Sequence, residues 1–134
     1  MFSPWGALRE LTHVTLHFIV MPDGAPARTD GRRRIWLDKR LQQAERRCAL
    51  THELVHLEHG HTSCQGPRVE RRVREETARR LVPFELLVEA YRWTQHPDEL
   101  AEELWVTVDV VRDLLAALTD VERTALAAST SRLP

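Results

Sequence analysis

The sequence predicts an α+β fold in which a small N-terminal β-hairpin or sheet packs on a helical core. A helix-turn-helix-like lobe ends the chain. Residues 13–20 alternate between polar and apolar side chains and are rich in β-branched and aromatic residues, which is typical of a strand. Nothing interrupts a helix between residues 41 and 59. Residues 98–118 have the pattern of two short helices joined by a tight turn.

Composition limits the class of protein. The chain has 134 residues, 43% of them hydrophobic, which is enough for one domain with a modest core and a small appended lobe. We therefore predict a domain over residues 1–96 and a helical lobe over residues 97–134. No apolar run reaches 18 residues and the first residues do not resemble a secretory signal, so we expect a cytoplasmic protein. Cys48 and Cys64 are then expected to be free thiols.

The N-terminal part is predicted to form a hairpin. Residues 5–11 favour a short helix before the strand at 13–20, and residues 21–31 favour a loop because Pro and Gly are frequent there. Residues 35–37 predict a second strand, antiparallel to the first. The outer strand of such a sheet offers an open edge that can pair with an extended peptide, although a purely structural sheet is the alternative.

The rest of the chain is predicted to be helical. Asp38 is expected either to cap a helix that begins near Lys39 or to occupy a turn just before it, and Gly60 is expected to end that helix. Further helices are expected from residue 68 to 81 or 82 and from 83 to 94. The last part, after residue 96, is expected to hold the helix-turn-helix-like pair and one final short helix.

The long helix contains the motif His52-Glu53-x-x-His56 within an apolar stretch. Residues four apart lie on one face of a helix, so both imidazoles can bind one metal ion. Glu53 follows the first histidine, where its carboxylate can reach a metal-bound water. This pattern indicates a zinc (Zn2+) site with His52 and His56 as ligands and Glu53 as the catalytic acid–base residue. The alternative is two histidines on a half-buried helix without metal.

A catalytic zinc site needs a third protein ligand. The metzincin pattern would place the third ligand, a histidine, at position 62 and a glycine at position 59. It is excluded because these positions hold Thr and His. Glu70 is the preferred third ligand because it shares a helical face with apolar positions of the next helix. Glu76, His61 and Cys64 are the alternatives, and a closed set that included Cys64 would make the site structural. His61 or Tyr91 is expected to stabilise the oxyanion.

The segment Arg34-Ile35-Trp36-Leu37-Asp38, the motif helix, Glu70 and Pro83 together resemble the ImmA/IrrE family of zinc metallopeptidases. This resemblance implies a zincin-like metallopeptidase domain with His52, His56 and Glu70 as ligands. It also implies a cytoplasmic endopeptidase that cleaves a helix-turn-helix transcriptional repressor of a phage or mobile element. Position 74 is Arg where the family has Asn or Asp, so a family contact to a ligand histidine is missing.

Two other functions are weighed against the peptidase. A metal-stabilised regulatory module without catalysis would use the same histidines. A DNA-binding regulator would use the basic first part of the chain, where residues 1–80 hold 15 basic and 10 acidic residues. However, the helix-turn-helix-like segment carries Arg112 against six acidic residues, so it would repel phosphate. The sequence therefore argues against direct nucleic-acid binding and for a protein partner.

Overall fold

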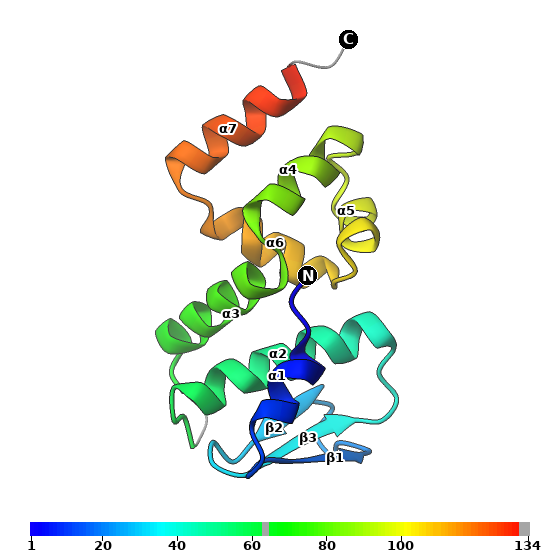
Figure 1. Ribbon diagram of the computed structural model, residues 1–134, viewed down its shortest axis with the longest axis vertical. Coiled ribbons are helices and arrows are strands. Elements are labelled where there is room, and N and C mark those ends of the chain that lie inside the picture. Colours follow the sequence, from blue (N-terminus) through cyan, green and yellow to red (C-terminus); the bar gives the residue numbers. More distant parts are fainter. Residues whose placement is uncertain (63–64, 132–134) are drawn as a thin grey trace.

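The computed structural model describes residues 1–62 and 65–131, and it has the expected α+β fold. Figure 1 shows a small sheet and α1 at one end, α4–α7 at the other, and α2 and α3 between them. The elements are α1 (Pro4–Glu10), β1 (Thr15–Ile19), β2 (Ala27–Thr29), β3 (Arg34–Asp38), α2 (Gln43–Glu58), α3 (Pro67–Leu81), α4 (Phe84–Trp93), α5 (Pro97–Leu104), α6 (Val108–Ala117) and α7 (Asp120–Ser131).

The sheet differs from the predicted hairpin. Its strand order is β1-β3-β2, with β1 parallel to β3 and β2 antiparallel to β3. The prediction that the two main strands are antiparallel was therefore wrong, and so was the prediction of a loop throughout residues 21–31. The physical reason is the return path: parallel neighbours need a crossover connection, and β2 forms inside that connection on the far side of β3.

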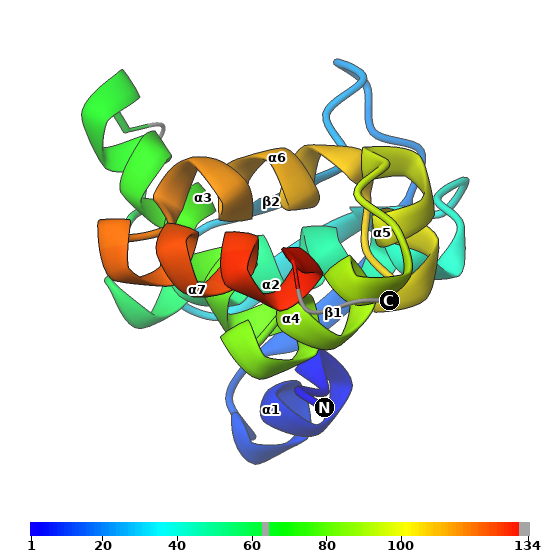
Figure 2. The same cartoon turned by 90° about the horizontal axis from the view of Figure 1, so that it is seen from above.

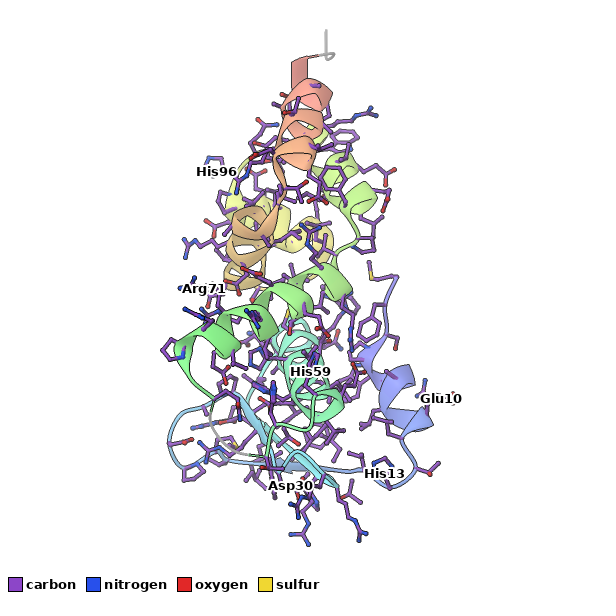
Figure 3. All side chains as sticks on the ribbon, turned by 90° about the vertical axis from the view of Figure 1, so that its left-hand side faces the viewer. Glu10, His13, Asp30, His59, Arg71 and His96 are labelled. Carbon is purple, nitrogen blue, oxygen red and sulfur yellow. The ribbon has the colours of Figure 1, made fainter. Side chains whose placement is uncertain are left out.

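A tight turn joins β2 to β3. The Asp30 carboxylate accepts hydrogen bonds from the backbone N–H groups of Arg32, Arg33 and Arg34, at 2.9, 2.9 and 3.0 Å. Gly31 has φ of +76°, a left-handed conformation that glycine adopts without steric cost. Asp30 lies at the end of the molecule that carries the sheet (Figure 3). This turn fixes the position of β2.

Helix α2 begins at Gln43, so Asp38 does not cap a helix that starts near Lys39. Asp38 ends β3, and its carboxylate accepts hydrogen bonds from the backbone N–H groups of Met21 and Arg40 and from the Arg40 side chain. Asp38 is thus the turn residue and not the N-cap. Gln42 is the N-cap and forms a capping box with Glu45. The helix ends before Gly60, which has φ of +70°, as expected.

Helix α2 lies between two hydrophobic cores. One core packs the sheet and α1 against Leu50 and Leu54, and the other packs α4–α7 and the end of α3 against Cys48. Consequently most positions from Arg47 to His56 are buried. The motif therefore occupies the centre of the molecule, with α1 on the flank opposite to β2 and α6 (Figure 2).

The second half of the chain follows the expected helices. Pro83 precedes α4, and the buried residues of α4 pack with those of α5–α7. Trp105, with φ of 57°, makes the tight turn between α5 and α6. The boundary at residues 96 and 97 stays a prediction. Within the described part of the chain, none of the helices is long and apolar enough to cross a bilayer.

One buried cation connects the cores. Arg47 is 5% exposed, and its guanidinium donates hydrogen bonds to the carbonyl groups of Phe2, Leu81, Leu104 and Trp105. The shortest, to Trp105, is 2.8 Å. These carbonyls belong to the N-terminal segment, the end of α3 and the α5–α6 turn. Burial lowers the pKa of the Arg47 guanidinium, because the charged form loses its hydration.

Replacement of this guanidinium is expected to destabilise the fold strongly. Arg47→Met keeps most of the apolar stem but leaves the four carbonyl groups without their donor. We expect the free energy of unfolding, measured by urea titration, to fall by about 3 kcal/mol. Arg72→Met on the exposed side of α3 is the control and should change it by less than about 0.5 kcal/mol. Equal effects of the two substitutions would contradict the role of Arg47.

Candidate metal centre

Three potential metal ligands meet between α2 and α3. His52 Nε2 lies 3.6 Å and His56 Nε2 lies 3.3 Å from the same Glu70 carboxylate oxygen, Oε2. One ligand atom from each residue can be chosen so that all three lie within 4.8 Å of one another. Atoms bound to one tetrahedral zinc ion are roughly 3.3 Å apart, as bond lengths of 2.0–2.2 Å imply. The spacing therefore fits a single ion.

The packing of α3 explains the position of Glu70. Val73, Thr77 and Leu81 are buried on the face that α3 turns to α2 and the helical core, as the sequence predicted. Glu70 lies one turn before Val73, so its carboxylate is on the same side. Its side chain is 26% exposed. The predicted inward orientation of Glu70 is thus what the structure has.

His61 is hydrogen-bonded to His56, one of the two candidate ligand histidines. Its Nδ1 lies 3.0 Å from His56 Nδ1, at hydrogen-bonding distance. This bond occupies the ring nitrogen of His56 that faces away from Glu70, and it leaves Nε2 for a metal ion. Ligand histidines are commonly fixed through the second nitrogen in this way. The sequence named His61 as an alternative ligand or oxyanion donor, but not as the partner of His56.

Glu53 is a buried carboxyl group next to the three ligands. It is 8% exposed, and burial raises the pKa of Glu53 to about 7. The negative charge of Glu70 adds to this increase, whereas the Arg28 guanidinium opposes it. A carboxyl group with a pKa near neutrality can both accept and donate a proton at physiological pH.

The pKa values of His52 and His56 are lowered, in contrast to that of Glu53. Burial lowers the pKa of His52 to about 4, and the neighbouring His56 contributes to this decrease. Burial also lowers the pKa of His56, although the Glu70 carboxylate opposes the effect. Both imidazoles are therefore neutral at pH 7, which is the state that binds metal.

The other candidates from the sequence lie elsewhere. Glu76 is hydrogen-bonded to His59 and Arg80, at 2.9 Å in each case, in a surface network. Cys48 is buried in the helical core, where the sequence expected it. Tyr91 packs against that core from α4 and is absent from the described residues that line the cleft. Cys64 falls outside the described residues.

Strand β2 forms the other side of the site. A pocket of about 340 Å³ is lined by Ala27, Arg28, Thr29, His52, Glu53, His56, His61, Thr62 and Glu70. β2 is an edge strand, since it is paired with β3 alone. The sequence predicted an open edge on a sheet but did not identify residues 27–29, because a three-residue strand leaves no clear alternation.

Arg74 on α3 is paired with an acidic residue of α6. Its Nε lies 3.9 Å from an Asp113 carboxylate oxygen, so it links α3 to α6. It also contributes to lowering the pKa of His52. His61, in the segment after α2, supplies the hydrogen bond to His56.

Two histidines from one helix and a glutamate from the next form a cluster that is compatible with a metal site, with a buried carboxyl group beside them. Residues 12–116 match the family model described as the IrrE N-terminal-like domain. The chain therefore belongs to this metallopeptidase family, which is of the ImmA/IrrE type, as the sequence indicated. No curated protein and no solved structure matches the chain.

The close contact between Gly31 and the backbone of His61 can be tested for its effect on stability and metal binding. A Cβ atom at Gly31 would lie 2.3 Å from the backbone oxygen of His61, in addition to the cost of a positive φ. We expect Gly31→Ala to lower the free energy of unfolding by at least about 2 kcal/mol and to weaken metal binding, because the loop that carries His61 must move.

Gly24→Ala is the matched control for this substitution. Gly24 has nearly the same φ, +75°, but a Cβ atom there meets nothing within 4 Å. Its cost should be limited to backbone strain, about 1 kcal/mol, and metal binding should not change. Urea unfolding and zinc titration of both variants measure the difference. Similar losses in both would show that the close approach to His61 is unimportant.

The opposite pKa shifts of Glu53 and His52 predict how stability depends on pH in the metal-free protein. The His52 pKa falls from 6.5 to about 4 on folding, so stability decreases as the pH drops through this window. The Glu53 pKa rises from 4.5 to about 7, so its contribution increases as the pH drops from 7 to 4.5. The two effects offset each other in the wild type.

Glu53→Gln removes one of these two effects. We expect the metal-free variant to lose stability relative to the metal-free wild type between pH 7.5 and pH 5, by an amount on the order of 2 kcal/mol. Urea unfolding at both pH values measures this difference. Glu85→Gln, at an exposed position on α4, is the control and should follow the wild type. A Glu53→Gln profile parallel to that of the wild type would disprove the coupling.

Proposed function

We propose that the protein is a zinc-dependent endopeptidase that cleaves a specific intracellular protein. The observation that carries this proposal is the arrangement of His52 Nε2, His56 Nε2 and Glu70 Oε2 around one point, with the buried Glu53 carboxyl group beside them. Membership of a metallopeptidase family supports a metal ion and a protein substrate. The donor set supports zinc in particular, because three N and O ligands leave a fourth tetrahedral position for water or substrate.

His52, His56 and Glu70 would hold the ion. When bound, zinc acts as a Lewis acid and makes a water molecule acidic enough to lose a proton near pH 7. His61 supports this site by fixing the His56 ring, and the buried surroundings keep both imidazoles neutral. Because neither imidazole is protonated, the Glu70 carboxylate would bind the zinc ion and would not form an ion pair with a histidine.

Glu53 performs the proton transfers in this proposal. Its carboxylate takes the proton of the attacking water and later delivers it to the leaving amine of the peptide. In the metal-free protein, burial raises the pKa of Glu53, which favours uptake of a proton by this carboxylate. His61 lines the same pocket and is the candidate for stabilising the oxyanion, whereas Tyr91 is not among the described lining residues.

The exposed edge of β2 is proposed to bind the substrate. An extended peptide paired with β2 would run past Glu53 and the three ligands, since Ala27, Arg28 and Thr29 line their pocket. By family resemblance, we propose that the substrate is a helix-turn-helix transcriptional repressor of a phage or mobile element. The chain would act on it in the cytoplasm.

Two other functions receive less support. A non-catalytic, metal-stabilised regulator leaves unexplained why an acidic group is buried beside the ligands at an energetic cost. Direct DNA binding is disfavoured by the acidic α5–α6 segment, where Arg112 is itself 3.9 Å from Asp109.

A pair of substitutions tests the proposed mechanism. Glu53→Gln should bind zinc as tightly as the wild type but cleave the cognate repressor at least about 1000-fold more slowly, because the proton acceptor is gone. Glu70→Ala should lower both zinc affinity and cleavage. Calorimetric zinc titration and cleavage followed by mass spectrometry are the measurements.

The control is Glu76→Gln, which changes a nearby glutamate of the surface network and should preserve both properties. Wild-type cleavage rates in the zinc-loaded Glu53→Gln variant would refute the assigned role of Glu53. Unfolding on zinc removal, together with intact repressor in every reaction, would favour the non-catalytic regulator.

A further inference from the structure

The proposed metal pocket continues into a second pocket toward the C-terminal lobe. This second pocket has a volume of about 430 Å³. Ala27, His52 and Glu53 line both pockets, so the two form one cleft. A volume of this size is within the range of ligand-binding pockets in proteins. None of the roles described so far uses this space.

Four elements form the walls of the second pocket. Side chains from the β2 region, from α2, from α3 and from α6 and its N-cap contribute, and the less polar of them are Pro26, Ala27, Leu41, Cys48, Ala49, Thr77, Thr107 and Val110. Several of these side chains are small, which leaves room for a large group. Ala49 precedes His52 by about one helical turn, so the pocket begins roughly 5 Å along α2 from a proposed ligand.

The polar atoms in these walls already have partners. Thr77 Oγ1 donates to the Val73 carbonyl at 2.7 Å, and Thr107 Oγ1 accepts from the Val110 N–H at 3.3 Å. Burial raises the pKa of the Cys48 thiol, and the neighbouring Thr107 opposes this increase. A polar substrate group that entered here would lose its water and would compete with these local hydrogen bonds, which is costly.

The charged side chains of the pocket are engaged as well. Glu45 accepts a hydrogen bond from the Gln42 N–H at 2.9 Å as part of the α2 capping box. Asp113 is paired with Arg74, and Asp109 is highly exposed beside Arg112. Glu45, Arg74 and Asp109 are exposed and Asp113 is half-buried, whereas the small apolar groups Ala27, Cys48 and Ala49 are buried. An apolar occupant thus fits better than a cationic one.

We propose that this pocket is a specificity subsite that binds a large apolar side chain of the substrate, such as that of leucine, methionine or phenylalanine. Val110 on α6 forms its outer wall, so the C-terminal lobe determines which peptide bond is presented to Glu53. This inference rests on the proposed peptidase function, because it takes a peptide as the occupant. It assigns a substrate-selecting role to the helix-turn-helix-like lobe.

The test uses zinc-binding probes. Three short peptide hydroxamates differ only in one side chain, which is isobutyl, methyl or aminobutyl. Calorimetry with the zinc-loaded full chain should give an affinity for the isobutyl probe at least about tenfold above that for the methyl probe, as three buried carbon atoms imply. Equal affinities, or a preference for aminobutyl, would overturn the proposal.

Substitutions on α2 and α6 then test whether the probe's side chain binds in this pocket. Ala49→Leu fills the pocket and should lower isobutyl affinity about tenfold while methyl affinity stays unchanged, which also shows that the metal site is intact. Ala44→Leu on the same helix is the control, since it lies outside the pocket lining. On α6, Val110→Ala should lower isobutyl affinity about fivefold, whereas Val108→Ala should not. Unchanged isobutyl affinity in both pocket variants would overturn the proposal.

A cleavage experiment separates this inference from the peptidase proposal. Wild type and Ala49→Leu are incubated with a random octapeptide pool, and the cleaved bonds are identified by mass spectrometry. Cleavage next to large apolar residues that shifts to smaller residues in Ala49→Leu supports both proposals. Cleavage without any side-chain preference overturns the pocket. No cleavage of this pool or of the cognate repressor, with the isobutyl preference in binding retained, overturns the peptidase function but not the apolar subsite.

Discussion

The arrangement of the whole molecule depends on the buried guanidinium of Arg47. It binds backbone carbonyls from the N-terminal segment, the end of α3 and the α5–α6 turn, and it sits one residue before Cys48 on the helix that carries the motif. The N-terminal segment, α2, α3 and the C-terminal lobe are thereby held in one geometry. The metal centre needs α2 and α3 in register, and the second pocket needs α6 beside α2. Both requirements are met through the same cation.

The sequence was sufficient for features that depend on local periodicity. The spacing of His52 and His56 follows from 3.6 residues per turn, and Glu70 could be placed because Val73, Thr77 and Leu81 mark the buried face of its helix. The starts of α3 and α4 were also predictable, since Pro67 and Pro83 limit where a helix can begin. In these cases the decisive interactions lie within a few residues along the chain.

Features that depend on distant contacts were not predictable. The parallel pairing of β1 with β3 requires knowledge of where β2 lies, and three residues give no readable alternation. Likewise, the bond between His61 and His56 exists because the loop after α2 is packed on Gly31, a contact between separate elements. The sequence could name Arg47 only as one of several arginines, since its burial is a property of the assembled cores.

The position of α2 between two cores has a consequence for any protein that is cut. The proposed ligands line a pocket beside β2, and a strand edge accepts an extended backbone rather than a helix. A folded helical target must therefore open locally before it fits. Its susceptibility would then follow the free energy of that opening, so a signal that loosens the target would be enough to start cleavage without any change in the protease.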